Sequence, residues 1–226
     1  MANPILAIVG VGQTGLAQGQ AKLFAQHGFD IALISRDQTA LKTATDELAA
    51  LNIKTTILTA DLTKLDTITA AFDQIKSLGQ LRAVIFNATY RPGIAPSKMT
   101  ADLVQTGLTI GAVAPVAIVQ AALPQLTATT EPTALLFTNS IAGAKPSTNA
   151  ALQAMEKAAM RNYVITLNED LTKKQSTVYA GMVTINTYIR HGKKENQDPD
   201  NIARAYYKLF EARSPVELPY HDLISE

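Results

Sequence analysis

The stretch ILAIVGVGQTGL, residues 5–16, decides the fold. Its first five residues form an apolar run typical of a buried strand, and the run ends in a GxGxxG pattern. A helical pattern then continues to Gly28, and a second apolar run occupies residues 31–34. A strand, a glycine-rich turn, a helix and a second strand within about 35 residues predict a βαβ unit.

The alternation of strand and helix patterns continues along the chain. Further strands are expected at residues 54–58, 81–86, 133–138 and 177–185, and helices at 39–51, 65–78, 101–126, 150–173 and 201–212. Six strands alternating with helices predict the α/β class: one doubly wound, Rossmann-type parallel sheet with helices on both faces. We expect residues 1–226 to form a single domain, with a C-terminal extension after about residue 190 and no regular element in 214–226.

The glycine pattern predicts a dinucleotide-binding loop. Gly10 permits the tight turn, Gly12 leaves room for a pyrophosphate, and Gly15 lets the helix pack close to the sheet. The N-terminus of that helix offers N–H groups and a partial positive charge to phosphates, and Gln13 and Leu16 of the same turn are expected to contact the ligand. A glycine-rich turn without a ligand is the alternative.

The end of the second strand bears on which dinucleotide is bound. An acidic residue there suits the ribose hydroxyl of NAD, whereas an arginine accommodates the 2′-phosphate of NADP. The strand ends in Ser35 and Arg36, and we expect Asp37 to cap the next helix instead. This pattern favours NADP(H) over NAD(H), with a surface arginine as the alternative.

Composition excludes several classes of partner and site. Lys and Arg number 20 against 19 Asp and Glu, so the net charge is +1 and no basic stripe predicts a nucleic-acid partner. The chain has no cysteine, and its three histidines lie at no metal-ligand spacing, so we expect no disulfide and no metal site. No targeting signal is expected at the start, and the composition is compatible with the cytoplasm.

A stretch without charge, residues 103–130, is long enough to span a bilayer. Glutamines, threonines and Pro115 and Pro124 interrupt it, so we expect a helix buried between subunits rather than a membrane helix. Interface cores are depleted in charge. The helix 101–126 is therefore expected to lie at an interface between subunits, with Pro115 as a kink.

Several motifs, in order, make the chain similar to the short-chain dehydrogenase/reductase family from about residue 5 to residue 189. Asp61-Leu62-Thr63 looks like the family's acidic motif beside the adenine, and Asn87-Ala88 looks like the remnant of its Asn-Asn-Ala-Gly motif. Asn139-Ser140-Ile141-Ala142-Gly143 resembles the Ser-Ser-x-Ala-Gly segment. Lys157 matches the lysine of the Tyr-x-x-x-Lys motif.

The resemblance also implies a homodimer or homotetramer, because helices 101–126 and 150–173 match those that pair subunits in the family. It further implies a lid over the substrate within the C-terminal extension at about 190–226.

The resemblance implies roles for the motif residues. Ser140 would polarise a substrate carbonyl, and Lys157 would bind the nicotinamide ribose. Thr184 is expected to reach the nicotinamide carboxamide. The alternatives are a serine that caps local backbone, an exposed lysine, and a β-branched strand residue. The cofactor-binding set is Gly10, Gly12, Gln13, Gly15, Leu16, Ser35, Arg36, Asp61, Leu62, Asn87, Ala88, Lys157 and Thr184.

Two departures from the family pattern affect the chemistry. The family tyrosine, which protonates the substrate oxygen, falls on Gln153, and the helix asparagine falls on Gly111. Gln153 lies four residues before Lys157, on the same helix face, but its amide has no titratable proton to give. Tyr90 is interpreted as a loop aromatic over the pocket, with a catalytic role as the alternative.

These features predict an NADP(H)-dependent oxidoreductase that acts on a small carbonyl or alcohol, with Ser140, Gln153 and Lys157 in the catalytic positions. The alternative is a dinucleotide-binding protein without catalysis, a sensor or partner subunit. A reaction such as isomerisation or dehydration also stays open.

Overall fold

The structure, a computed structural model, describes residues 3–220. It contains seven strands: β1 (Ile5–Val9), β2 (Asp30–Ser35), β3 (Thr55–Thr59), β4 (Leu81–Phe86), β5 (Thr133–Ser140), β6 (Val178–Ile185) and β7 (Glu217–Tyr220). Its main helices are α1 (Leu16–Gln26), α2 (Gln38–Ala49), α3 (Leu65–Leu78), α4 (Ala101–Leu108), α5 (Ala114–Leu126), α6 (Ala151–Lys173) and α7 (Pro199–Ala212).

The strands form one parallel sheet in the order β3-β2-β1-β4-β5-β6-β7. The chain therefore builds outward from β1 to β3, returns to β4 beside β1, and continues to the other edge. This is the predicted doubly wound, Rossmann-type α/β fold. Its winding reverses between β1 and β4, and in such sheets ligands bind beside the carboxyl ends of the strands at that point.

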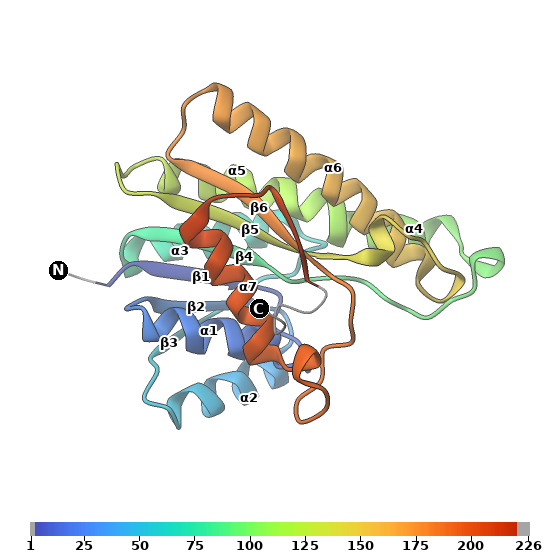
Figure 1. The fold of residues 1–226 in the computed structure, drawn as a ribbon, viewed down its shortest axis with the longest axis horizontal. Coiled ribbons are helices and arrows are strands. Elements are labelled where there is room, and N and C mark those ends of the chain that lie inside the picture. The colour runs from blue at the N-terminus through green and yellow to red at the C-terminus, as the bar shows by residue number, and fades with distance from the viewer. Residues whose placement is uncertain (1–2, 221–226) are drawn as a thin grey trace.

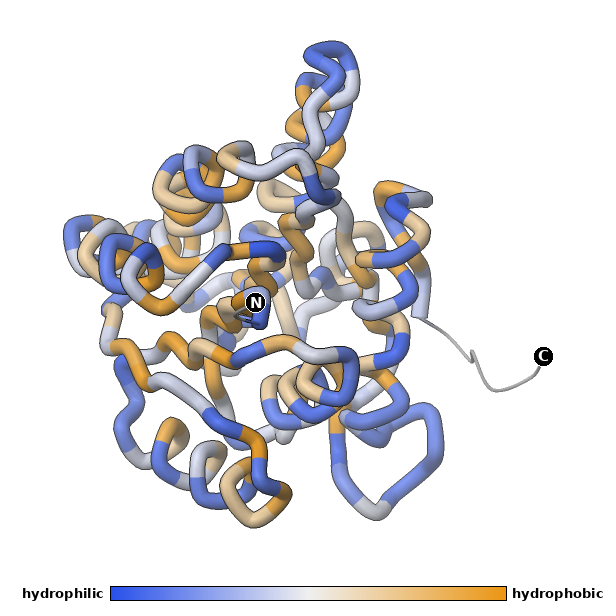
Figure 2. The backbone as a smooth tube through the Cα atoms, turned by 90° about the vertical axis from the view of Figure 1, so that its left-hand side faces the viewer, coloured by the Kyte–Doolittle hydropathy of each residue, from blue (hydrophilic) through white to orange (hydrophobic). Residues whose placement is uncertain are grey.

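Helices cover both faces of the sheet, and Figure 1 shows α5 and α6 on one side and α1 and α2 on the other. Alternate residues of β1 point to opposite faces: Leu6 and Ile8 pack with α1, α2 and α7, while Ala7 and Val9 pack with α3, α5 and α6. The helices show alternating hydrophobic and hydrophilic positions in Figure 2, as one buried face requires.

The seventh strand corrects the sequence prediction, which contained six strands and no regular element after residue 213. Glu217–Tyr220 pairs in parallel with the end of β6 at the sheet edge. Four residues with Pro219 among them give no alternating pattern, and proline is tolerated in a sheet mainly at an edge. The helix α7 and β7 thus belong to the layers of the sheet.

The expected helix over 101–126 is divided by a π-helical turn, Thr109–Val113, between α4 and α5. Pro115 lies in the first turn of α5, where its missing N–H is accommodated, so the predicted irregularity is present just before the proline. The segment is long and apolar enough to cross a membrane by length and composition, with a mean hydropathy of 1.7. However, Ala114, Ile118 and Leu126 are fully buried in the core.

Candidate active site

A cleft of about 870 Å³ opens at the carboxyl ends of the central strands. Residues that follow β1 to β6 border it, together with the first turns of α6. Twelve of the predicted site residues line this one cleft: Gly10, Gly12, Leu16, Ser35, Arg36, Asp61, Leu62, Asn87, Ala88, Ser140, Gln153 and Lys157. The fold therefore brings together side chains that are far apart in the sequence.

The glycine loop runs along one wall of the cleft. Gly10 has φ +95°, and a Cβ added there would lie 2.7 Å from the backbone nitrogen of Ala88, so only glycine fits. A Cβ added at Gly12 would have no described heavy atom within 4 Å outside its own residue and its two chain neighbours, so it would lie in open space. Gly15 adopts a left-handed φ of +79° and begins α1, whose first turn carries no acidic residue. This helix N-terminus is suited to an anion.

The end of β2 forms the next part of the wall. Asp37 accepts a hydrogen bond at 3.0 Å from the backbone N–H of Ala40, so it caps α2 as predicted. Ser35 Oγ donates to the carbonyl of Val11 at 3.4 Å. Arg36 lies 3.5 Å from Asp61, and its side chain is 60% exposed, so the guanidinium remains available to a ligand.

Asp61 follows β3 and stays ionised. The backbone N–H of Thr63 donates to its carboxylate at 3.0 Å and the hydroxyl of Thr63 at 2.8 Å. The Thr63 N–H is the main cause that lowers the pKa of Asp61; burial opposes it, and Arg36 and Lys64 contribute to the lowering. The carboxylate is thus fixed in place beside Arg36.

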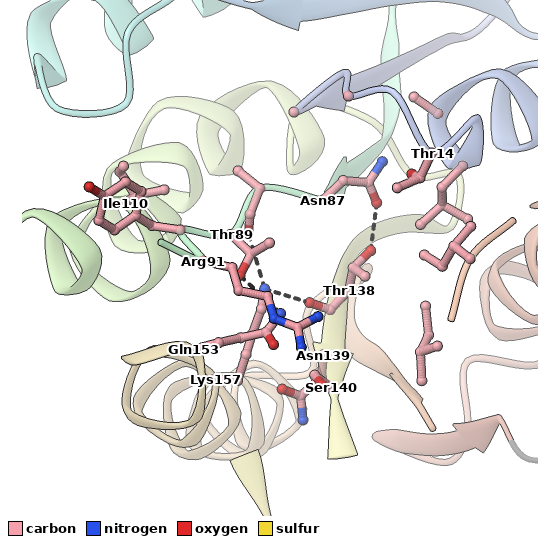
Figure 3. Close-up of a pocket in the computed structure, with 18 of the residues that line it drawn as sticks. Thr14, Asn87, Thr89, Arg91, Ile110, Thr138, Asn139, Ser140, Gln153 and Lys157 are labelled. Atoms are coloured by element: carbon pink, nitrogen blue, oxygen red, sulfur yellow. Dashed lines mark hydrogen bonds between the residues drawn. The ribbon is translucent and has the colours of Figure 1, made fainter. Parts of the chain in front are cut away.

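A buried polar network supports the floor of the cleft, shown in part in Figure 3. Asn87 exchanges hydrogen bonds with Gln20 at 2.7 and 3.2 Å, and it accepts one from Thr138 at 2.5 Å. The Thr138 hydroxyl also pairs with the phenol of Tyr206 at 2.6 Å. Such a satisfied network fixes the ends of β4 and β5 relative to α1 and α7.

Lys157 lies in the interior beneath this floor, where only 2% of it is exposed. Its ammonium donates to the carbonyl oxygens of Ala88 at 3.0 Å and Thr138 at 2.9 Å. Burial lowers the pKa of Lys157 to about 8, and the charge of Glu156 opposes that shift. The lysine is therefore not an exposed helix lysine, and two backbone carbonyls direct it toward the cleft.

Ser140 and Gln153 face the same part of the cleft. Ser140 ends β5, and its oxygen accepts a hydrogen bond from the Ala142 N–H at 3.2 Å, which is the local capping considered as an alternative. Gln153 donates from Nε2 to the hydroxyl of Thr89 at 3.3 Å. Figure 3 shows Gln153 and Lys157 on α6 beside Thr89 and Ser140.

Three predicted contacts are not among the residues that border the cleft: Gln13, Gly15 and Thr184. For Thr184 the reason is clear. Its hydroxyl donates to Glu217 of β7 at 2.6 Å and accepts from Asn139 at 3.2 Å, so it is engaged between strands. Its partner Glu217 belongs to β7, the strand that the sequence did not predict. Gly15 is covered by the ring of His191.

Sequence reasoning missed Glu156 and Thr89. Glu156 is fully buried, and it accepts hydrogen bonds from the Thr89 hydroxyl and from the backbone N–H of Tyr90. Burial raises the pKa of Glu156, against the opposing effects of Lys157, Thr89 and Tyr90. Among residues 3–220 no group of three or more His, Cys, Asp or Glu residues is placed to hold a metal ion. The available signal in the sequence was the pair of departures expected at Gly111 and Gln153.

Comparison with known proteins agrees with this geometry. The sequence matches the family described as short chain dehydrogenase over residues 5–198. The chain therefore belongs to the short chain dehydrogenase family, and its class is that of the NAD(P)-dependent oxidoreductases. This membership favours an enzyme over a dinucleotide-binding protein without catalysis. No curated protein matches the chain by sequence.

Solved structures share the fold over nearly the whole chain. A short-chain dehydrogenase from Rhodopseudomonas palustris has a TM-score of 0.83 at 18% identity, over 97% of this chain and 98% of that one. An alcohol dehydrogenase from Thermococcus sibiricus, complexed with 5-hydroxy-NADP, has a TM-score of 0.79 at 19% identity, over 99% and 98%. A Pseudomonas aeruginosa PAO1 short chain oxidoreductase, described as containing an atypical catalytic center, has a TM-score of 0.83 at 16% identity, over 99% and 97%.

Proposed function

We propose that the protein is an NADP(H)-dependent oxidoreductase that interconverts a small carbonyl compound and its alcohol, with Gln153 at the position of the family tyrosine. The observation that carries the proposal is the cleft itself. It combines the glycine loop at the N-terminus of α1 with Arg36 at one end and Ser140 and Lys157 at the other. These groups suit the phosphates of a dinucleotide and the oxygen of a carbonyl, respectively.

The residues present fit a phosphorylated dinucleotide. The open space at Gly12 allows a pyrophosphate to approach the backbone, and the N-terminus of α1 supplies N–H groups to it. Ser35 and Arg36 would hold the 2′-phosphate, and Asp37 is engaged as a helix cap rather than free for a ribose hydroxyl. Asp61 and Leu62 would lie beside the adenine. The NADP analogue bound by the Thermococcus sibiricus enzyme also favours this preference.

When bound, a nicotinamide dinucleotide supplies or accepts a hydride. The chain's own residues then have to orient the substrate and handle charge on its oxygen. The Ser140 hydroxyl is proposed to donate a hydrogen bond to the carbonyl oxygen, and Lys157 to bind ribose hydroxyls through the proton that its two carbonyl partners do not use. Gln153 is proposed to hold Thr89 and to donate an amide hydrogen bond without giving up a proton.

Oxidation of NADPH by a reactive dicarbonyl, phenanthrenequinone, or by small aldehydes tests the proposal. We expect NADPH oxidation that depends on the protein, and a 10²–10³-fold lower kcat in Ser140→Ala with unchanged NADPH affinity. Ser77→Ala, at an exposed site of α3, is the matched control and should keep the wild-type rate. A wild-type rate equal to the protein-free rate would refute the proposal.

Assembly and location complete the proposal. We infer a homodimer or homotetramer through α4–α5 and α6, because residues 103–130 carry no charge and Val113 is 45% exposed on this surface. We also infer that the enzyme acts in the cytoplasm. Light scattering at micromolar concentration should give at least twice the 24.2 kDa chain mass, and a clean monomer would refute the assembly.

A further inference from the structure

Glu156 is a buried carboxylate one side chain away from the cleft. None of its surface is exposed, and it does not border the cleft itself. The Thr89 hydroxyl donates to its Oε1, and the Tyr90 N–H donates to both carboxylate oxygens at 3.2 Å. A carboxylate this deep is rare unless it is paired or has a chemical task.

The chain makes room for this carboxylate by leaving position 111 without a side chain. A Cβ added to Gly111, in the π-helical turn, would lie 2.5 Å from both Cβ and Oε2 of Glu156. Glu156 therefore fills the volume that any side chain at 111 would occupy. The two departures from the family pattern are thereby connected. Glu156 packs against Gly111 and contacts the hydroxyl of Thr89, and Gln153 donates a hydrogen bond to the same hydroxyl.

The surroundings favour the protonated acid. Burial raises the pKa of Glu156, and the opposing groups are the Lys157 charge and the hydrogen bonds from Thr89 and Tyr90. Within residues 3–220 no ion pair joins Lys157 to Glu156, because the ammonium is directed to two backbone carbonyls. The helical segment that packs against Glu156 adds no charge, since residues 103–130 carry none.

Thr89 connects the buried acid to the cleft. It is exposed and borders the cleft, its hydroxyl contacts Glu156, and Gln153 donates to its oxygen at 3.3 Å. Figure 3 shows Thr89 beside Gln153 and Lys157 at this corner. When Glu156 is protonated, its O–H can donate to Thr89, which leaves the Thr89 proton to point into the cleft.

We propose that Glu156 is the proton source and Thr89 the relay that replace the family tyrosine in carbonyl reduction. This inference rests on the proposed function. As the carbonyl carbon gains a hydride from the reduced nicotinamide, the substrate oxygen takes the Thr89 hydroxyl proton, and Thr89 takes the proton of Glu156. The products are the alcohol, a Glu156 carboxylate and the oxidised nicotinamide. Glu156 then regains a proton from solvent through Thr89.

The first test follows the protonation of Glu156 without any turnover. Infrared spectra of the protein are recorded across pH for the wild type, Glu156→Gln and Glu169→Gln. Glu169 is exposed on the same helix and pairs with Lys173, so it is the matched control. We expect a protonated carboxyl band that disappears above pH 4.5, that Glu156→Gln removes and that Glu169→Gln keeps. A Glu156 that is ionised at and above pH 4.5 would overturn the proposal.

The second test measures NADPH oxidation with phenanthrenequinone. Glu156→Gln and Thr89→Val should lower kcat by about 10²-fold while the KM for NADPH stays unchanged, and Thr89→Ser should restore it. Wild-type kcat should fall as pH rises through the pKa of Glu156, and the fall should be absent in Glu156→Gln. Circular dichroism and thermal melts confirm that each variant is folded.

The outcomes separate the two proposals. A wild type without NADPH oxidation refutes the proposed function, and the relay falls with it. An active wild type whose variants keep kcat within twofold and the same pH profile refutes the relay alone. Glu156 would then only brace the 89–90 backbone.

Discussion

Replacing Gly12 by valine should weaken NADPH binding without destabilising the fold. A Cβ at Gly12 meets no described heavy atom within 4 Å, and its φ is not in the left-handed region. The free energy of unfolding should therefore change by less than about 0.5 kcal/mol. This open space beside Gly12 is also where the pyrophosphate is proposed to bind, so the valine side chain would occupy the position of the pyrophosphate.

The loss of affinity follows from the hydrogen bonds that the side chain would block. A hydrogen bond to a charged group contributes about 1.5–3 kcal/mol, so loss of one such contact raises the Kd for NADPH about 10- to 150-fold. Fluorescence titration of NADPH measures the Kd, and thermal unfolding measures the stability of the same samples.

Gly10→Ala is the contrasting variant. Its φ of +95° and a Cβ 2.7 Å from the Ala88 nitrogen predict a loss of about 1–3 kcal/mol in unfolding free energy. For a chain of this size, Tm falls by about 2–4 °C per kcal/mol. The reasoning is refuted if Gly12→Val binds NADPH as the wild type does, or if it unfolds as early as Gly10→Ala.

Two further predictions concern charged side chains. NMR of ¹³C-labelled lysine should show one resonance that titrates near pH 8 and is absent in Lys157→Met. Because this pKa lies below the unfolded value of 10.5, Lys157 makes the free energy of unfolding rise with pH between the two values. Titration of every lysine near pH 10.5 would contradict the burial argument. Arg161→Ala should lower the free energy of unfolding by about 1 kcal/mol near neutral pH, as measured by urea unfolding. Burial raises the pKa of Glu217, but the hydrogen bonds from Arg161 and Thr184 outweigh it, so the pKa is lowered overall. That contribution is present above pH 4.5 and is lost as pH falls through the folded pKa, so an equal cost in acid would contradict it.

Much of the fold followed from local patterns. The bounds predicted for α3 and β4, 65–78 and 81–86, agree with the structure because Gly79 and Asn87 mark clear ends. The strand β7 could not be found this way, since its stability comes from pairing with β6 rather than from its own four residues. The π-helical turn likewise depends on packing against α6.

In the candidate site, too, local sequence patterns predicted some residues, and packing between distant segments determined others. Residues that follow strands were predictable, because parallel strands bring their carboxyl ends to one edge, and nine of the twelve predicted residues that border the cleft follow or end a strand. The position of Glu156 was not predictable, because its burial depends on the absence of a side chain at Gly111, which lies in another helical segment. The hydrogen bond from Thr184 to Glu217 was not predictable either, because Glu217 lies on a strand that the sequence did not indicate.

The most direct test of the central claim is a parallel titration of NADPH and NADH against the wild type and Arg36→Ala, followed by cofactor fluorescence. The account predicts that the wild type prefers NADPH and that Arg36→Ala loses this preference while its NADH affinity stays the same. The reason is that the 2′-phosphate is the one part of the cofactor that the guanidinium is proposed to bind. Equal affinity of the wild type for both cofactors would contradict the NADP(H) preference. Binding of neither would contradict the dinucleotide site.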